Sequence, residues 1–299
     1  MKKVTPADAR PDSRGRFRLG RPRLLIVGCG DIGGRILARL ASRFRILALT
    51  SSPERVPQLR AAGAVPIVGN LDRRRSLARL AGFHSRVIHL APPTETSVRT
   101  DARTRALLAA LRRRPDRLVY VSTTGVYGDR GGARVDETTP AAPVNDRAWR
   151  RLDAEKIVRA AQGSVLRAPG IYAHDRLPLA RLRSGAPALA PEDDVYSNHI
   201  HADDLARLCI AALFRGAHGR VYNAVDRSQL KMGEYFDLVA DRCGLPRPPR
   251  LPREQLRAAV SPMMYSFMSE SRRIIGVRIE RELRLRLAWP TVADTLATV

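Results

Sequence analysis

Three glycines near the start of the chain have a spacing that can bind phosphate groups. Gly28, Gly30 and Gly33 follow the pattern G-x-G-x-x-G within the sequence LLIVGCGDIGGRILARL. In such a pattern the first glycine makes a tight turn, the second lets the backbone approach a pyrophosphate, and the third lets a helix pack closely on a strand. Backbone amides at the start of that helix then hold the phosphates. The pattern predicts a dinucleotide-binding site that includes these glycines together with Asp31 and Ile32.

The residues on either side of the glycines predict the strand and the helix that this site needs. Leu24 to Val27 form a short apolar run that is typical of a buried parallel strand. Behind the glycines, apolar residues recur at helical intervals at Ile32, Ile36, Leu37 and Leu40. The chain is therefore expected to pass from a strand through a glycine turn into a helix, which is the context that gives the motif its meaning.

The end of the next expected strand favours NADP over NAD. A site that prefers NAD commonly has an acidic residue about 20 residues after the glycine motif, where it binds the ribose hydroxyls. Here the strand RILALT runs into TSSPER at residues 50–55, with no carboxylate at the strand end. NAD stays possible, because Glu54 could turn inward. A 2′-phosphate could instead be bound by hydroxyl groups and a guanidinium, those of Thr50, Ser51, Ser52 and Arg55.

Strands and helices alternate along most of the chain. This alternation predicts an α/β fold with a doubly wound parallel sheet, in which ligands bind at the carboxyl ends of the strands. After the first strand, further strands are expected at residues 45–50, 64–68, 86–90, 117–122, 164–168 and 220–224. Helical segments are expected at residues 74–80, 102–113, 202–214 and 232–243.

The charge and composition exclude several classes of protein. The net charge is +24, yet the arginines are spread along the chain and aromatic residues make up 5%, whereas nucleic-acid-binding proteins concentrate charge and add stacking aromatics. We therefore expect solvated helix surfaces and no specific nucleic-acid partner. The three cysteines lack C-x-x-C spacing, so neither a disulfide framework nor a metal site is expected. No apolar run reaches the roughly 20 residues that span a bilayer, so we expect a cytoplasmic protein without a membrane partner.

Three later motifs resemble those of a known family. STTGVYGD occupies residues 122–129, LRAPGIY residues 166–172 and NHIHADDLA residues 198–206. Their order and separation resemble those of the extended and atypical short-chain dehydrogenase/reductases, the group that contains the NAD-dependent sugar-nucleotide epimerases and dehydratases. The resemblance covers about residues 24–223, and residues 266–291 look like a bacterial atypical branch. It implies a Rossmann-type domain that transfers a hydride between a nicotinamide and a carbonyl or alcohol of a small-molecule substrate. It also implies a possible homodimer.

The resemblance implies further site residues. Thr123 matches the family's hydroxyl that hydrogen-bonds a substrate oxygen. Asn70 and Leu71 would border the adenine. The residues that would line the ribose and nicotinamide are Leu90, Ala91, Pro92, Ser122, Pro169, Gly170 and Ile171.

The family's catalytic Tyr-x-x-x-Lys pair is where this sequence departs from the pattern. When the family's following glutamate is aligned with Glu155, Arg147 stands at the tyrosine position and Arg151 at the lysine position. Arginine stays protonated and is a poor general acid or base, but it can hold a carboxylate or phosphate through two parallel hydrogen bonds. One hypothesis is an oxidoreductase in which these arginines bind an anionic group or the cofactor phosphates. The alternative is a redox sensor or regulatory module that binds NADP without turnover.

Other groups could supply a proton, but each is more readily explained by structure. Tyr172, His174 and Asp175 follow a Pro-Gly-Ile turn and could reach a pocket there. His199 and His201 are commonly structural in the family. All five are therefore interpreted as structural residues.

The chain is expected to divide into three parts. The first is a disordered basic tail without the apolar centre of a secretory signal, and the second is the NAD(P)-binding domain. The third combines the last sheet elements with a small, discontinuous substrate lobe. The cluster at residues 263–268 is predicted to pack within that lobe, and a role in flooring a substrate pocket or a subunit contact stays open. The tail covers residues 1–20, the domain 21–175, the last sheet elements about 199–224, and the lobe about 176–198 and 225–299.

Overall fold

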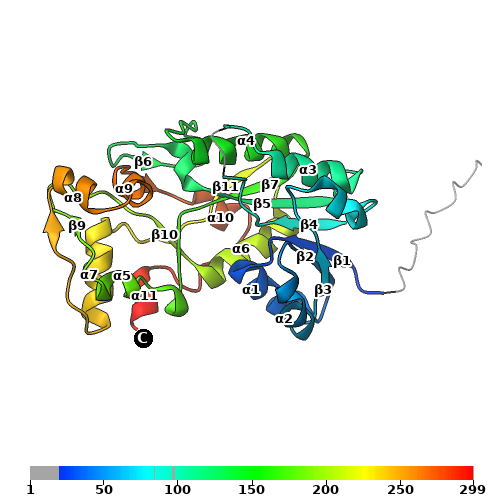
Figure 1. Cartoon of the computed structure of the whole chain (residues 1–299), viewed down its shortest axis with the longest axis horizontal. Helices are drawn as coiled ribbons and strands as arrows, with labels where there is room; N and C mark the ends of the chain where they lie inside the picture. The colour runs from blue at the N-terminus through cyan, green and yellow to red at the C-terminus, as the bar shows by residue number, and fades with distance from the viewer. Residues whose placement is uncertain (1–19, 84, 96–97, 299) are drawn as a thin grey trace, which may run out of the picture.

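Seven parallel strands form the central sheet of the protein (Figure 1). The computed structural model describes residues 20–83, 85–95 and 98–298, so nearly all of the expected basic tail lies outside the described residues. The strand order is β11-β7-β5-β4-β1-β2-β3. The strands are β1 (Arg23–Val27), β2 (Arg45–Thr50), β3 (Val65–Val68), β4 (Arg86–His89), β5 (Arg117–Thr123), β7 (Ser164–Ala168) and β11 (Val221–Asn223).

The strand order reverses between β1 and β4. The chain builds outward from β1 through β2 to β3, then returns to place β4 on the other side of β1. In an open parallel sheet this reversal leaves a crevice at the carboxyl ends of the strands, where ligands bind. The arrangement confirms the predicted α/β fold with a doubly wound, Rossmann-type sheet.

Helices cover both faces of the sheet, because alternate residues of its strands are apolar on both sides. Leu24 and Ile26 of β1 belong to one buried cluster, and Leu25 and Val27 belong to the other. The first cluster packs against α1 (Asp31–Leu40), α2 (Val56–Ala61) and α6 (Ala202–Arg215). The second packs against α3 (Ala102–Leu111), α4 (Asp146–Ala160) and the short 3-10 helix Arg74–Leu80 (Figure 1).

The C-terminal part adds a lobe beside the carboxyl edge of the sheet (Figure 1). Two small apolar clusters, separate from the sheet clusters, hold it together. α10 (Val277–Arg281) instead packs against β11 of the central sheet. The remaining helices are α5 (Leu179–Arg183), α7 (Met232–Arg242), α8 (Arg253–Ala259), α9 (Pro262–Met268) and α11 (Val292–Leu296).

Three short parallel strand pairs lie outside the central sheet, and the sequence did not predict them as pairs. Each strand in them is two or three residues long, too short for a periodic apolar pattern. The pairs are β8 (Gly170–Tyr172) with β10 (His199–His201), β6 (Arg134–Val135) with β13 (Arg273–Ile274), and β9 (Ala188–Leu189) with β12 (Arg250–Leu251). None of the helices in the described ranges is long and apolar enough to cross a membrane.

A buried ion pair joins α4 to β7 under the carboxyl edge. Arg167 and Glu155 lie 2.7 Å apart, and their side chains are 6% and 1% exposed. The guanidinium of Arg167 also lies over the ring of Tyr127, whose hydroxyl donates to the Asn223 side chain at 2.8 Å. This cluster fixes α4 relative to the strand ends.

We expect Glu155→Gln to lower the free energy of unfolding by about 3 kcal/mol, because it leaves a buried guanidinium without its countercharge. Urea-induced unfolding measures the change. The matched control is Glu280→Gln, which removes an exposed ion pair with Arg227, and its unfolding midpoint should equal that of the wild type. Equal midpoints for both variants would contradict the assigned role of Glu155.

Candidate functional site

The glycine turn after β1 meets the constraints that its sequence predicted. Gly28 has a φ of +81°, and a Cβ atom there would lie 2.7 Å from the backbone nitrogen of Ala91 in the loop after β4. A Cβ atom on Gly33 would lie 3.0 Å from the sulfur of Cys29. Gly30 is exposed, and a Cβ atom on it would meet nothing within 4 Å. Packing therefore constrains the first and third glycines, while the second faces open space where a ligand can approach.

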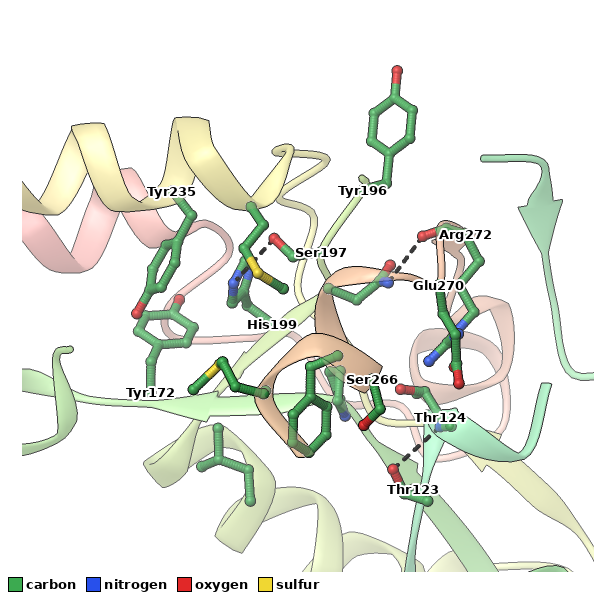
Figure 2. Close-up of a pocket in the computed structure, with 18 of the residues that line it drawn as sticks. Thr123, Thr124, Tyr172, Tyr196, Ser197, His199, Tyr235, Ser266, Glu270 and Arg272 are labelled. Carbon is green, nitrogen blue, oxygen red and sulfur yellow. Dashed lines mark hydrogen bonds and ion pairs between the residues drawn. The ribbon is translucent and has the colours of Figure 1, made fainter. Parts of the chain in front are cut away.

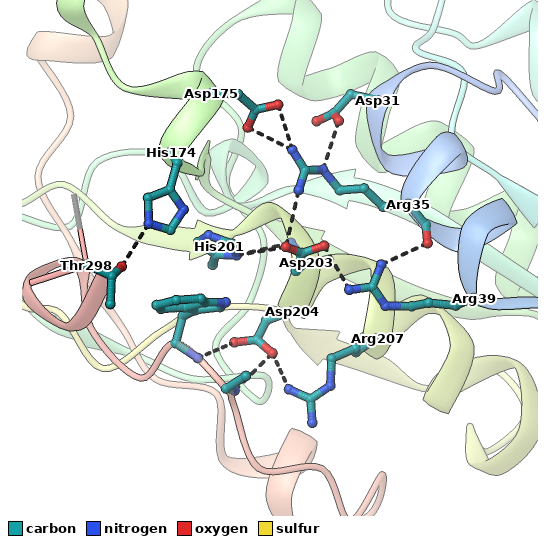
Figure 3. Close-up of polar contacts among 12 residues, drawn as sticks. Asp31, Arg35, Arg39, His174, Asp175, His201, Asp203, Asp204, Arg207 and Thr298 are labelled. Carbon is teal, nitrogen blue, oxygen red and sulfur yellow. Dashed lines mark hydrogen bonds and ion pairs between the residues drawn. The ribbon is translucent and has the colours of Figure 1, made fainter. Parts of the chain in front are cut away.

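The start of α1 is suited to bind an anion. The helix begins at Asp31, and no described side chain caps it. Its first-turn amides therefore remain free to hold a phosphate group. The Asp31 carboxylate pairs with Arg35 at 2.8 Å (Figure 3) and with Arg176 at 3.0 Å. These cations offset the negative charge that would otherwise repel a pyrophosphate.

Arg35 connects α1 to two later segments of the chain (Figure 3). Besides Asp31, its guanidinium contacts Asp175 at 2.8 Å and Asp203 at 3.2 Å. Asp175 follows β8, and Asp203 is in the first turn of α6, where it also pairs with Arg39. Asp175, one of the residues considered as a proton donor, is therefore engaged in an ion pair.

The residues after β2 border the same open region. Thr50 is buried, and its hydroxyl accepts a hydrogen bond from the backbone of Ser52 at 3.2 Å. Ser51 and Glu54 are exposed, and Arg55 is half-buried. Burial raises the pKa of the Cys29 thiol, and the charge of Arg55 opposes this effect. The guanidinium of Arg55 therefore lies close enough to the glycine turn to act on it electrostatically.

An ion pair that the sequence analysis missed joins the loops after β3 and β4. Arg103 of α3 donates two hydrogen bonds to Asp72, at 2.8 and 2.6 Å, and a third to the Pro92 carbonyl at 3.1 Å. The side chain of Asn70 accepts from the Asp72 backbone at 2.8 Å, and Leu71 is buried beside it. The hydrogen bond from Arg103 helps to lower the pKa of Asp72. This pair fixes the two loops that are expected to border the adenine and ribose.

Strand ends on the other side of the reversal carry further predicted residues. The amide of Leu90 donates to the Val27 carbonyl at 2.8 Å, which aligns the loop after β4 with the glycine turn. Ser122, near the end of β5, is buried. Both predicted residues therefore lie at the carboxyl edge, where the dinucleotide is expected.

A cleft of about 510 Å³ lies between the sheet domain and the lobe (Figure 2). It brings together residues from β5, α4, β8, α7 and α9 and from the segment after α9. Among the predicted site residues, those that line it are Thr123, Arg147, Pro169, Gly170 and Ile171.

Thr123 and Arg147 face the cleft, whereas Arg151 is bound to β5. The Thr123 hydroxyl accepts a hydrogen bond from the Gly125 amide at 3.2 Å (Figure 2). Arg147 is exposed, and its guanidinium lies 4.3 Å from the ring centre of Phe267. Arg151 donates to the Tyr120 hydroxyl at 3.1 Å and to the Val121 carbonyl at 3.0 Å, and it does not line the cleft. The structure thus gives the two arginines different surroundings.

Tyr172 and His199 lie in a buried wall of the cleft together with Tyr235 (Figure 2). The rings of His199 and Tyr235 lie 4.3 Å apart. Burial lowers the pKa of His199 to about 4 and raises the pKa of Tyr172 and Tyr235. His174 is exposed and shares a hydrogen bond of 2.9 Å with Thr298.

Two charged residues opposite Arg147 were not predicted as site residues. Glu270 and Arg272 line the cleft and form an ion pair of 2.6 Å, and Arg272 also donates to the Gly128 carbonyl. In the sequence they appear in a segment without a regular pattern, 110 residues or more beyond the end of α4 at Ala160. They belong to residues 266–291, which carry part of the family resemblance, but their position in the cleft depends on how the lobe packs against α4.

Comparisons with known proteins support an NAD(P)-binding domain. A family model described as NAD(P)H-binding matches residues 28–215. A 4-hydroxy-2-methyl-3-oxo-4-farnesyl-3,4-dihydroquinoline-1-oxide ketoreductase from Stigmatella aurantiaca is 28% identical over 240 residues, 73% of this chain and 72% of that protein.

Two solved structures share the fold over nearly the whole chain. A conserved protein of unknown function from Silicibacter pomeroyi is 29% identical, with a TM-score of 0.78 over 93% of this chain and 97% of that one. A dTDP-glucose 4,6-dehydratase from Streptomyces venezuelae, solved with NAD bound, is 21% identical, with a TM-score of 0.73 over 92% and 95%. The family model confirms the predicted NAD(P)-binding domain, and the similarity to the dehydratase confirms the predicted fold.

We expect Gly30→Val to weaken NADH and NADPH binding by more than about 100-fold, because a branched side chain would occupy the path of the pyrophosphate. Isothermal titration calorimetry measures both dissociation constants. Gly34→Val is the matched control, since a Cβ atom on Gly34 also meets nothing within 4 Å but lies beyond the turn. Wild-type affinity in Gly30→Val would show that the dinucleotide binds elsewhere.

Asp226 lies behind the buried wall and gives a prediction about pH. Burial raises its pKa to about 7, although the Ser228 amide and the Tyr172 hydroxyl oppose this effect. Between about pH 4 and pH 7 the folded state therefore binds more protons than the unfolded chain. The contribution of protonated Asp226 to the free energy of unfolding is present at low pH and is lost as the pH rises through about 7.

We therefore expect Asp226→Asn to melt at a higher temperature than the wild type at pH 8, and the difference to shrink at pH 5. Thermal melts of both proteins at the two pH values test this. A melting difference that is independent of pH would mean that Asp226 does not titrate in this range.

Proposed function

Because the chain belongs to the NAD(P)H-binding family, we propose that it binds NADP and transfers a hydride between the nicotinamide and a carbonyl or alcohol of a small-molecule substrate. The observation that carries this proposal is the position of two features on one sheet edge. The glycine turn follows β1 and Thr123 ends β5, and β4 lies between these strands. The two features are therefore about 10 Å apart across the sheet, with the cleft next to Thr123.

Residues along the carboxyl edge of the sheet would contact the successive parts of a bound dinucleotide. The amides at the start of α1 would hold the pyrophosphate, and the loops fixed by Asp72 and Arg103 would border the adenosine. Pro169, Gly170 and Ile171 would border the nicotinamide, since they line the cleft. When bound, the nicotinamide supplies or accepts the hydride.

NADP is proposed over NAD because of the residues after β2. The hydroxyl of Ser51 is exposed, and Arg55 lies close enough to the glycine turn to affect Cys29. Glu54, which could have bound ribose hydroxyls, is exposed and precedes Arg55 in a short 3-10 helix. A 2′-phosphate placed here would meet a guanidinium instead of a carboxylate.

Thr123 is proposed to orient the substrate oxygen. Its oxygen already accepts from Gly125, and within the described chain its hydroxyl hydrogen has no acceptor, so it can donate to a carbonyl. Arg147, one turn before Arg151, is proposed to bind an anionic group of the substrate. Arg151 would act as a positioning residue, because it holds the end of β5 through the Val121 carbonyl. We propose that solvent supplies the proton for the substrate oxygen, because the arginines are poor proton donors.

A second candidate function is a redox sensor that binds NADP without turnover. The pKa values in the buried wall favour it: His199 is neutral above about pH 4, and burial raises the pKa of Tyr172 and Tyr235. None of these three groups exchanges a proton readily near pH 7. Single-turnover oxidation of bound NADPH by a panel of ketones and aldehydes separates the candidates. Oxidation supports the enzyme, and a stable NADPH signal across the panel supports the sensor.

We expect Arg55→Ala to weaken NADPH binding by about 10- to 100-fold and to leave NADH binding within about twofold, because only NADPH carries the 2′-phosphate. Fluorescence titration of nucleotide-free protein with each dinucleotide gives the ratio of dissociation constants. Arg60→Ala, an exposed arginine on α2, is the control and should leave the ratio unchanged. An unchanged ratio in Arg55→Ala would overturn the proposed preference.

A further inference from the structure

Several polar side chains that line the cleft are engaged within the protein. The Asn198 amide donates to the Arg272 carbonyl at 2.9 Å, and its oxygen accepts from the Ile274 backbone at 2.8 Å. The Ser266 hydroxyl donates to the Met263 carbonyl at 2.7 Å. Glu270 is paired with Arg272. These amide, hydroxyl and carboxylate groups are therefore not free to bind a ligand.

Arg147 differs from the other cations of the cleft. Arg176 pairs with Asp31, and Arg272 pairs with Glu270. Arg147 makes no ion pair within 4 Å to any carboxylate of the described residues, and it stacks on Phe267. Glu270 acts on Arg147 electrostatically but is bound to Arg272. The guanidinium of Arg147 is thus positioned to take an anion from outside the protein.

The walls around Arg147 are apolar and adaptable. Phe267 is 50% exposed, and its neighbour on α9, Met263, is 64% exposed. Inside the cleft, further apolar and aromatic side chains from α7, α9 and β8 extend this surface. Such side chains adjust their shape to apolar ligands. Those that line the cleft are Ile171, Met232, Tyr235, Phe236 and Met264.

We propose that the substrate of this cleft is an amphipathic carbonyl compound with an apolar body and a single carboxylate, and not a nucleoside-diphosphate sugar. The carboxylate binds Arg147, and the apolar body lies against Phe267 and Met264. This inference rests on the proposed function, because it names the substrate class of the same site. A nucleoside diphosphate would bring at least two negative charges close to Glu270, with one unpaired arginine to receive them.

Binding of three probes to the full-length protein saturated with NADP⁺ tests the proposal. The probes are 4-benzoylbutyrate, its uncharged methyl ester, and UDP-glucose, and isothermal titration calorimetry gives each dissociation constant. We expect 4-benzoylbutyrate to bind about tenfold more tightly than the ester, and UDP-glucose to bind more weakly than either.

Three variants then assign the recognition to residues. Arg147→Gln should remove the tenfold preference for the carboxylate, and Phe267→Ala should weaken the acid and the ester equally. Lys156→Gln, which removes an exposed cation further along α4, should leave both affinities unchanged. Thermal melts of each variant verify that it is folded.

Several results would overturn the inference. They are tighter binding of UDP-glucose, a carboxylate preference that survives in Arg147→Gln, and no binding of either benzoyl probe at millimolar concentration. Failure of the proposed function looks different, because it is the absence of NADPH binding or of NADPH oxidation in the wild-type protein. An Arg147-dependent carboxylate preference without NADPH oxidation would support the inferred ligand class and contradict hydride transfer.

Discussion

The close approach of the glycine turn to the loop after β4 is the constraint on which the site depends. A Cβ atom on Gly28 would lie 2.7 Å from the Ala91 nitrogen, so a side chain at this position would push the two loops apart. The same loops are tied by the hydrogen bond from Leu90 to Val27. Because these strand ends border the reversal of the sheet, their separation determines how closely a dinucleotide can lie along the carboxyl edge and how it reaches the cleft beside Thr123.

Many of the arginines act as internal connections between distant segments. Arg35 joins α1 to residues after β8 and to the start of α6 (Figure 3), and Arg103 joins the loops after β3 and β4. Exposed pairs contribute little one by one, but these arginines contact several partners at once. The net charge of +24 thus includes cations that shape the candidate site, and Arg147 stands apart from them because no described carboxylate pairs with it.

The sequence predicted the parts of the protein that follow local rules. Strand β1, the glycine turn and α1 are local, since apolar periodicity and glycine spacing determine them within 18 residues. The wall of the cleft is not local: Glu270 and Arg272 meet α4 only because the lobe folds back, and strands of two or three residues such as β8 leave no periodic signal. The sequence also did not predict in which direction each side chain points. Arg147 and Arg151 lie one helical turn apart, yet one faces the cleft and the other binds the backbone of β5.

A crystal structure of the protein with NADP⁺ tests the central claim most directly. We expect the pyrophosphate at the amides that follow Gly30, the 2′-phosphate within hydrogen-bond distance of Arg55, and the nicotinamide between Thr123 and Ile171, open to the cleft. Two results would overturn the proposed binding mode: a dinucleotide bound away from the glycine turn, and one whose nicotinamide points away from the cleft. The first result would remove the binding site proposed here, and the second would separate binding from hydride transfer.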